Sequence, residues 1–140
     1  VMRFVLPLAA ALMAVTAASV PLAPAALAQS AKPERVQFAK GTSSKTIKGT
    51  LKGDQSRQFV VNVRAGQTMT VKLTASNGST YFNVTAPGAQ QAMFIGSTSG
   101  NTMTEVIPSS GDYTVDLFMM RNAARRGEVT SFTITIGATG

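Results

Sequence analysis

An alternation of apolar and polar side chains, with a period of two residues, runs through most of this chain after residue 45 and limits its possible folds. In 68–74, for example, Met69, Val71 and Leu73 occupy every second position, with polar residues between them. This period places one set of side chains on each face of a strand, so that one face is buried and the other meets solvent. No stretch after residue 30 has the period of a helix. The pattern therefore predicts an all-β protein.

The same alternation gives the expected strands, which are separated by turn-forming residues such as Gly, Asn and Asp. The candidates are 46–51, 58–63, 68–74, 81–86, 91–95, 102–107, 113–120 and 129–136, with 36–38 as an additional first strand. Short strands at this spacing are typical of two packed sheets. We expect a single antiparallel β-sandwich of about seven to eight strands over residues 35–140. Its expected core includes Phe59, Val61, Val71, Leu73, Val115, Leu117, Phe132 and Ile134.

The N-terminal segment has the composition of an export signal. Arg3 is its only charged residue, and Ala26-Leu27-Ala28 matches the small-x-small pattern of a signal-peptidase site. A membrane anchor is the competing interpretation, but three prolines interrupt the apolar run and no basic stop follows it directly. We predict a signal peptide over 1–28 that is cleaved before Gln29, a flexible leader over 29–34, and no stable membrane insertion. The predicted location is the periplasm of a Gram-negative bacterium.

The composition of the mature chain excludes several kinds of chemistry. The chain has no His and no Cys, so it lacks the usual general base, the thiol nucleophile and the ligands of transition-metal sites. Asp112 and Asp116 lie on one predicted strand about 13 Å apart, too far for a glycosidase pair whose carboxyls converge across a cleft. We therefore expect no enzyme, no cofactor and no metal.

The balance of charges is basic. Without Arg3, 12 of the 13 Lys and Arg residues remain against 6 acids, which gives a net charge of +6. A positive domain can bind nucleic acid, an anionic envelope surface or an acidic protein. Export argues against nucleic acid, and the aromatic residues do not alternate with the basic ones as a base-stacking surface requires.

Three arginines cluster in Arg121-Asn122-Ala123-Ala124-Arg125-Arg126, between the last two predicted strands. A cluster at the tip of a hairpin contributes nothing to a core and costs charge repulsion. It suits a loop that presents cations to an acidic partner. A solvated turn that keeps a basic protein soluble is the alternative, and residue types alone favour it slightly.

Tyr113 lies on the inward face of its predicted strand, just after Ser110-Gly111. A tyrosine in such a place packs in the core and bonds its hydroxyl to a nearby backbone group, as in the corners of sandwiches. We therefore expect a structural role for Tyr113, and a turn at Ser110-Gly111.

Two resemblances follow from these motifs. The segments 49–53, 59–67 and 110–115 resemble the bacterial pre-peptidase C-terminal type of β-sandwich. More specifically, Ser110-Gly111-x-Tyr113, then Arg121-Asn122-x-x-Arg125, then a final strand resembles the bacterial periplasmic inhibitors of g-type lysozyme. The second resemblance spans about residues 35–136, nearly the whole mature domain.

The resemblance to the inhibitors implies a function and a site. The partner would be a g-type lysozyme, and Arg121 and Arg125 would meet the acidic groups of its substrate cleft. Arg suits this task because its planar fork bonds a carboxylate bidentately and stays charged. Asn122 would brace the loop, and Arg126 would add to the positive field. The loop 54–57 departs from the family, because it has no aromatic residue.

A second class of function stays open at this point. A generic exported β-sandwich that binds a cell-envelope polymer or another protein would have the same fold, and the fold does not decide between the two.

Overall fold

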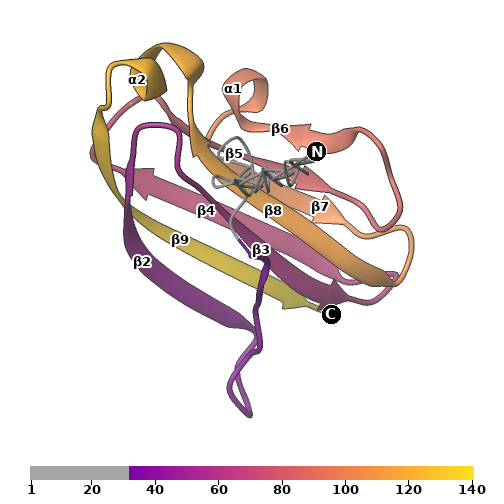
Figure 1. Ribbon diagram of the computed structural model, residues 1–140. Helices are drawn as coiled ribbons and strands as arrows, with labels where there is room; N and C mark the ends of the chain where they lie inside the picture. Colours follow the sequence, from indigo (N-terminus) through magenta and orange to yellow (C-terminus); the bar gives the residue numbers. More distant parts are fainter. Residues whose placement is uncertain (1–31) are drawn as a thin grey trace, which may run out of the picture.

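Two β-sheets pack face to face in the structure, a computed structural model that describes residues 32–140 (Figure 1). The predicted signal peptide and residues 29–31 of the predicted leader lie outside the described residues. The larger sheet has the strand order β1-β3-β8-β5-β6, and the smaller has the order β2-β9-β4-β7. The strands are β1 (Glu34–Arg35), β2 (Ser44–Lys52), β3 (Ser56–Val63), β4 (Thr68–Ala75), β5 (Thr80–Thr85), β6 (Ala92–Ile95), β7 (Thr102–Val106), β8 (Gly111–Met119) and β9 (Val129–Thr139).

The core lies between the two sheets and is formed by the inward positions of the alternating segments. In β8, Tyr113, Val115 and Leu117 are fully buried, while the residues between them are only partly buried. All eight predicted core residues are buried, with exposed fractions of 6% or less. The prediction of an all-β sandwich is therefore confirmed.

The first strand differs from the prediction in place and in direction. It comprises Glu34–Arg35 instead of 36–38, and it pairs with β3 in parallel, so the sandwich is not purely antiparallel. Ion pairs fix it there, because Arg35 binds Asp112 at 2.9 Å and Glu34 binds Arg57 at 2.7 Å. Glu34, which the sequence placed in the flexible leader, is thus part of the sheet.

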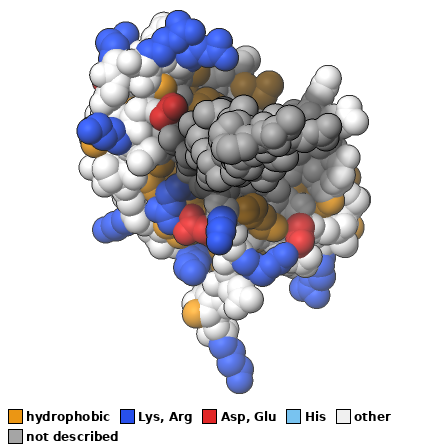
Figure 2. Space-filling view, viewed as in Figure 1, with side chains coloured by type: hydrophobic (Ala, Val, Ile, Leu, Met, Phe, Trp, Pro, Cys, Tyr) orange, Lys and Arg blue, Asp and Glu red, His pale blue; other side chains and the backbone are white. Residues whose placement is uncertain are grey.

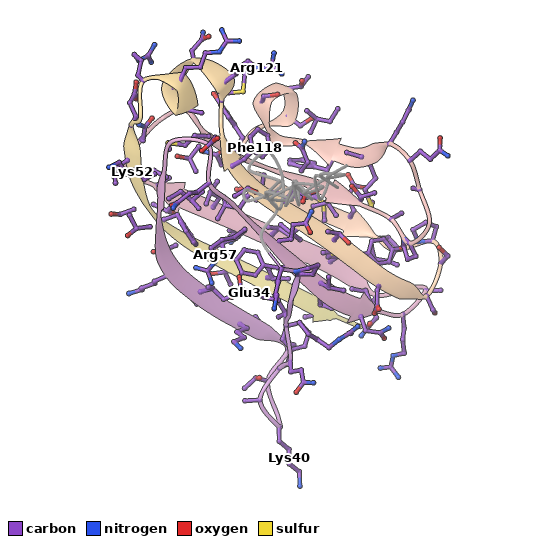
Figure 3. All side chains as sticks on the ribbon, in the orientation of Figure 1. Glu34, Lys40, Lys52, Arg57, Phe118 and Arg121 are labelled. Atoms are coloured by element: carbon purple, nitrogen blue, oxygen red, sulfur yellow. The ribbon has the colours of Figure 1, made fainter. Side chains whose placement is uncertain are left out.

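Arg57 bridges the two sheets at the edge where β2 and β3 meet. Its guanidinium carbon lies 5.2 Å from the ring centre of Phe59 in the larger sheet and 5.4 Å from that of Phe132 in the smaller one. Figure 3 shows Arg57 close to Glu34, which accepts two hydrogen bonds from it. A Cβ at Gly49 would lie 2.8 Å from the Phe132 ring, so the glycine leaves room for this stack. The loop between β2 and β3 is shorter than the predicted 54–57, since Ser56 and Arg57 belong to β3.

In the described part of the chain, two short helices interrupt the strands, α1 (Gly96–Ser99) and α2 (Arg121–Arg125). The expectation that 121–126 forms a hairpin tip without helix is wrong. The segment carries the chain from β8 in the larger sheet to β9 in the smaller one, across sheets that pack about 10 Å apart. A tight turn would have kept both strands in one sheet. Among residues 32–140, no helix is long and apolar enough to cross a membrane.

Candidate protein-binding site

Three chain connections meet at the end of the sandwich that carries α2 (Figure 1). They are the β2–β3 turn, the β4–β5 turn and the β8–β9 connection. The Met120 amide, just before α2, donates to the Ser79 carbonyl at 2.8 Å. The Gly53 amide donates to the Glu128 carbonyl, also at 2.8 Å. Backbone hydrogen bonds therefore join the arginine-bearing segment to the turns on both sides of it.

The local sequence explains why α2 is short and where it ends. Ala123 is fully buried and holds the helical turn against the sandwich. Gly127 follows with a φ of +67°, the left-handed conformation that ends many helices. The Gly127 amide donates to the Ala124 carbonyl at 3.0 Å, and the Glu128 amide donates to the Ala123 carbonyl at 3.2 Å. This pair of bonds is the Schellman motif, and it fixes the exit of the helix.

The three arginines of this segment are not equivalent. Arg121 and Arg125 are four residues apart on one helical turn, so their side chains leave α2 roughly 40° apart. Both are exposed, and neither side chain has a hydrogen bond or ion pair within residues 32–140. Arg126 is about 140° from Arg121 by the same geometry, and its Nε donates to a Glu128 carboxylate oxygen. Two neighbouring cations on α2 are therefore available to a partner.

Positive side chains dominate the surface at this end. Figure 2 shows Lys and Arg side chains gathered over α2, and Figure 3 shows Arg121 projecting from it. Lys52, at the end of β2, is exposed beside the β2–β3 turn. Nothing in the local sequence pointed to Lys52, because only the sandwich brings the end of β2 next to the start of β9.

Glu128 is the acidic residue closest in sequence to the arginines, and both of its carboxylate oxygens already accept hydrogen bonds. One carboxylate oxygen accepts from Asn77 Nδ2 at 2.9 Å and the other from Arg126 Nε. The hydrogen bond from Asn77, and then the one from Arg126, hold the pKa of Glu128 below its ordinary value of 4.5. Glu128 therefore stays ionised and neutralises Arg126 without touching Arg121 or Arg125.

Asn122 is exposed, and its side chain makes no hydrogen bond within the described part of the chain. Its carbonyl accepts from the Arg126 amide at 3.4 Å. The bracing expected of Asn122 is supplied instead by buried Ala123 and by the contacts of Glu128.

The Ser110-Gly111-x-Tyr113 motif lies at the other end of β8, about 25–30 Å from α2 along the strand. Tyr113 is fully buried, and its hydroxyl donates to the Ser109 carbonyl at 2.7 Å. The Ser110 hydroxyl oxygen accepts from the Ala65 amide at 2.8 Å. Tyr113 thus packs in the core with its hydroxyl bonded to the backbone, and the two motifs lie too far apart to form one site.

Four of the six acidic residues are bonded to other side chains, and the acids do not converge on one point within residues 32–140. Three of the six form ion pairs with arginines: Glu34, Asp112 and Glu128. Asp116 accepts from Gln58 Nε2 at 2.6 Å. Within residues 32–140, no three acids gather as metal ligands would. What this end of the sandwich offers is charge complementarity to an acidic surface.

Comparison with solved structures shows which proteins share this fold. PliG of Aeromonas hydrophila, a periplasmic inhibitor of g-type lysozyme, is similar to 80% of this chain over its full length, with 34% identity and a TM-score of 0.72. The chain belongs to the PliG family. The PliG of Salmonella Typhimurium shares the fold at 23% identity, with 79% of this chain and all of that chain covered and a TM-score of 0.62.

The other expected resemblance also appears. The pre-peptidase C-terminal domain of a Bacillus anthracis collagenase shares the fold at 16% identity, with a TM-score of 0.55 over 79% of this chain and 98% of that one. No protein-family model matches this PliG-family chain, and a search of curated proteins finds no match.

Proposed function

We propose that the mature domain is a periplasmic inhibitor of a g-type lysozyme. The observation that carries this proposal is the similarity to the Aeromonas hydrophila PliG, which covers that whole protein at 34% identity. The basic charge of the mature chain and the predicted export signal agree with a partner that has an acidic cleft and acts on the cell envelope.

Arg121 and Arg125 are the residues that we propose to enter the substrate cleft. They share one exposed side of α2 and have no intramolecular partner among residues 32–140. A lysozyme cleft carries catalytic carboxylates, and arginine bonds a carboxylate through two parallel N–H groups. Arg126 contributes less, because Glu128 already pairs with it.

The test is the lysis of a peptidoglycan suspension by g-type lysozyme, with wild type and single variants of the inhibitor. Arg121→Ala or Arg125→Ala should cost roughly 2–5 kcal/mol of affinity, because each leaves a desolvated carboxylate of the cleft unpaired. Arg126→Ala should cost less. Lys40→Ala is the matched control, since Lys40 is an exposed cation on a loop far from α2 (Figure 3).

Two results would count against parts of the proposal. If wild type at micromolar excess leaves lysis unchanged, the inhibitor assignment fails and a generic exported binding module replaces it. If wild type inhibits and both arginine variants inhibit equally well, the family function stands and the site assignment fails.

The proposed location includes cleavage before Gln29, which removes residues 1–28. N-terminal sequencing of protein released from the periplasm tests it. An intact N-terminal segment in the membrane fraction would contradict cleavage.

A further inference from the structure

The Glu128 side chain joins two segments that are distant in sequence. Its partner Asn77 lies in the β4–β5 turn, 51 residues away, and its other partner is Arg126 at the exit of α2. About a third of the Glu128 side chain is exposed, whereas Arg126 is 63% exposed. The carboxylate therefore sits between the turn and the helix, and each of its oxygens accepts from one of them.

The main chain of Glu128 makes two more connections at the same point. Its amide donates to Ala123 within α2, and its carbonyl accepts from Gly53 in the β2–β3 turn. One residue thus contacts all three connections at this end of the sandwich. A change in its side chain acts on the segment that carries the exposed arginines.

Two further hydrogen bonds orient Asn77 for this contact. Its side-chain oxygen accepts from the Ser79 amide at 2.9 Å, which leaves its NH₂ group free to face Glu128. Its own amide donates to the Thr130 hydroxyl at 3.3 Å. Thr130 and Thr80 are buried and bonded to each other at 2.8 Å. Asn77 is therefore held through the turn by the buried pair of threonines, Thr80 and Thr130.

We propose that Glu128 and Asn77 are positioning residues of the inhibitor: their hydrogen bond holds α2 so that Arg121 and Arg125 face the partner, and Glu128 withdraws Arg126. This inference rests on the proposed function, because it concerns how the same loop is presented. It adds two residues that do not themselves need to touch the lysozyme.

The pair allows a polarity swap as a test. In Glu128→Gln, the new amide NH₂ at position 128 faces another donor, either the NH₂ of Asn77 or the guanidinium of Arg126. In Asn77→Asp, two carboxylates face each other, although the bond to the Ser79 amide is kept. In the double variant, the new amide NH₂ at position 128 donates to the new carboxylate at position 77, and the amide oxygen at position 128 accepts from Arg126. The net charge of the double variant equals that of wild type.

Inhibition constants against g-type lysozyme should follow this logic. Each single variant should inhibit roughly 10-fold more weakly, as expected when the binding arginines are displaced by less than about 1 Å. The double variant should return to within about 2-fold of wild type. Asp116→Asn is the matched control, because it alters a carboxylate–amide pair of the same kind, with Gln58, in the middle of the larger sheet. It should leave inhibition unchanged.

Amide hydrogen exchange of the free inhibitor gives a second measurement that needs no lysozyme. The amides of Ala124 and Glu128, which close α2, should exchange about 10-fold faster in each single variant and recover in the double one. The amides of β8 should keep their protection. If wild type fails to inhibit, the proposed function falls, and the exchange rates still decide whether this pair holds α2.

Three results would overturn the inference. The first is single variants that lower the melting temperature but inhibit and exchange like wild type, which would make the pair a general stabiliser. The second is stronger inhibition by Glu128→Gln, which would make Arg126 a contact that Glu128 restrains. The third is a double variant as weak as the single ones.

Discussion

Replacing Arg57 tests whether the open edge of the sandwich is held by a cation between two aromatic rings. The Arg57 side chain is only 27% exposed, and its guanidinium lies 5.2 Å and 5.4 Å from the ring centres of Phe59 and Phe132. An exposed cation–π contact contributes about 0.5–1 kcal/mol and a desolvated one about 2. The ion pair with Glu34 adds roughly 0–1 kcal/mol, because the Glu34 side chain is 46% exposed.

These contributions predict that Arg57→Ala lowers the free energy of unfolding by about 2–3 kcal/mol. Glu34→Ala removes only the ion pair and should cost less than about 1 kcal/mol. Arg57→Lys keeps the charge but loses the planar group that lies on the rings, so it should fall between the two. Urea unfolding at pH 7, analysed by linear extrapolation, measures all three differences.

Arg125→Ala is the control, because Arg125 is an exposed arginine without an ion pair in the described residues. It should change stability by less than about 0.5 kcal/mol, the scale of an ordinary surface substitution. The reasoning is refuted if Arg57→Ala also stays below that value. It is refuted equally if Glu34→Ala costs as much as Arg57→Ala, since the ion pair and not the stack would then hold the edge.

Two further predictions concern the stability of the domain. Leu117→Ala removes a fully buried side chain from the middle of β8 and should cost roughly 2–5 kcal/mol in urea unfolding, whereas a loss under about 0.5 kcal/mol would show that this face is not packed. The free energy of unfolding should also fall in acid, because hydrogen bonds hold the pKa values of three carboxyls below their ordinary values of 3.8 or 4.5. The main hydrogen-bond partner is an arginine for two of them and Asn77 for Glu128. Their contribution is complete above about pH 5 and is lost as the pH falls through the folded-state values, so urea midpoints that stay level down to about pH 3 would contradict it. The carboxyls are Glu34, Asp112 and Glu128.

The family of this chain could be predicted from motifs, but only one of the two motifs marks the proposed site. Tyr113 was assigned correctly to the core from its place in the alternation, and its bond to the Ser109 carbonyl was expected because a buried hydroxyl needs a hydrogen-bond partner. The arginine segment was found from its composition, and its form was mistaken for a hairpin tip. Gly127 directly after two arginines is a local signal for the end of a helix, and it would have distinguished α2 from a hairpin tip.

For every strand except the first, the sequence by itself determined where the strand lies to within a few residues, and for the longer strands it determined which face is buried, because the period of two is a property of neighbouring residues. In β4, for example, Met69, Val71 and Leu73 were assigned to the buried face, and all three are buried. Only the tertiary structure decided which sheet each strand joins, and therefore that the arginine segment crosses between sheets. It alone brought Asn77 to Glu128 and Glu34 to Arg57, across 51 and 23 residues. Such contacts depend on how the sheets pack, and the local pattern of apolar and polar residues does not specify them.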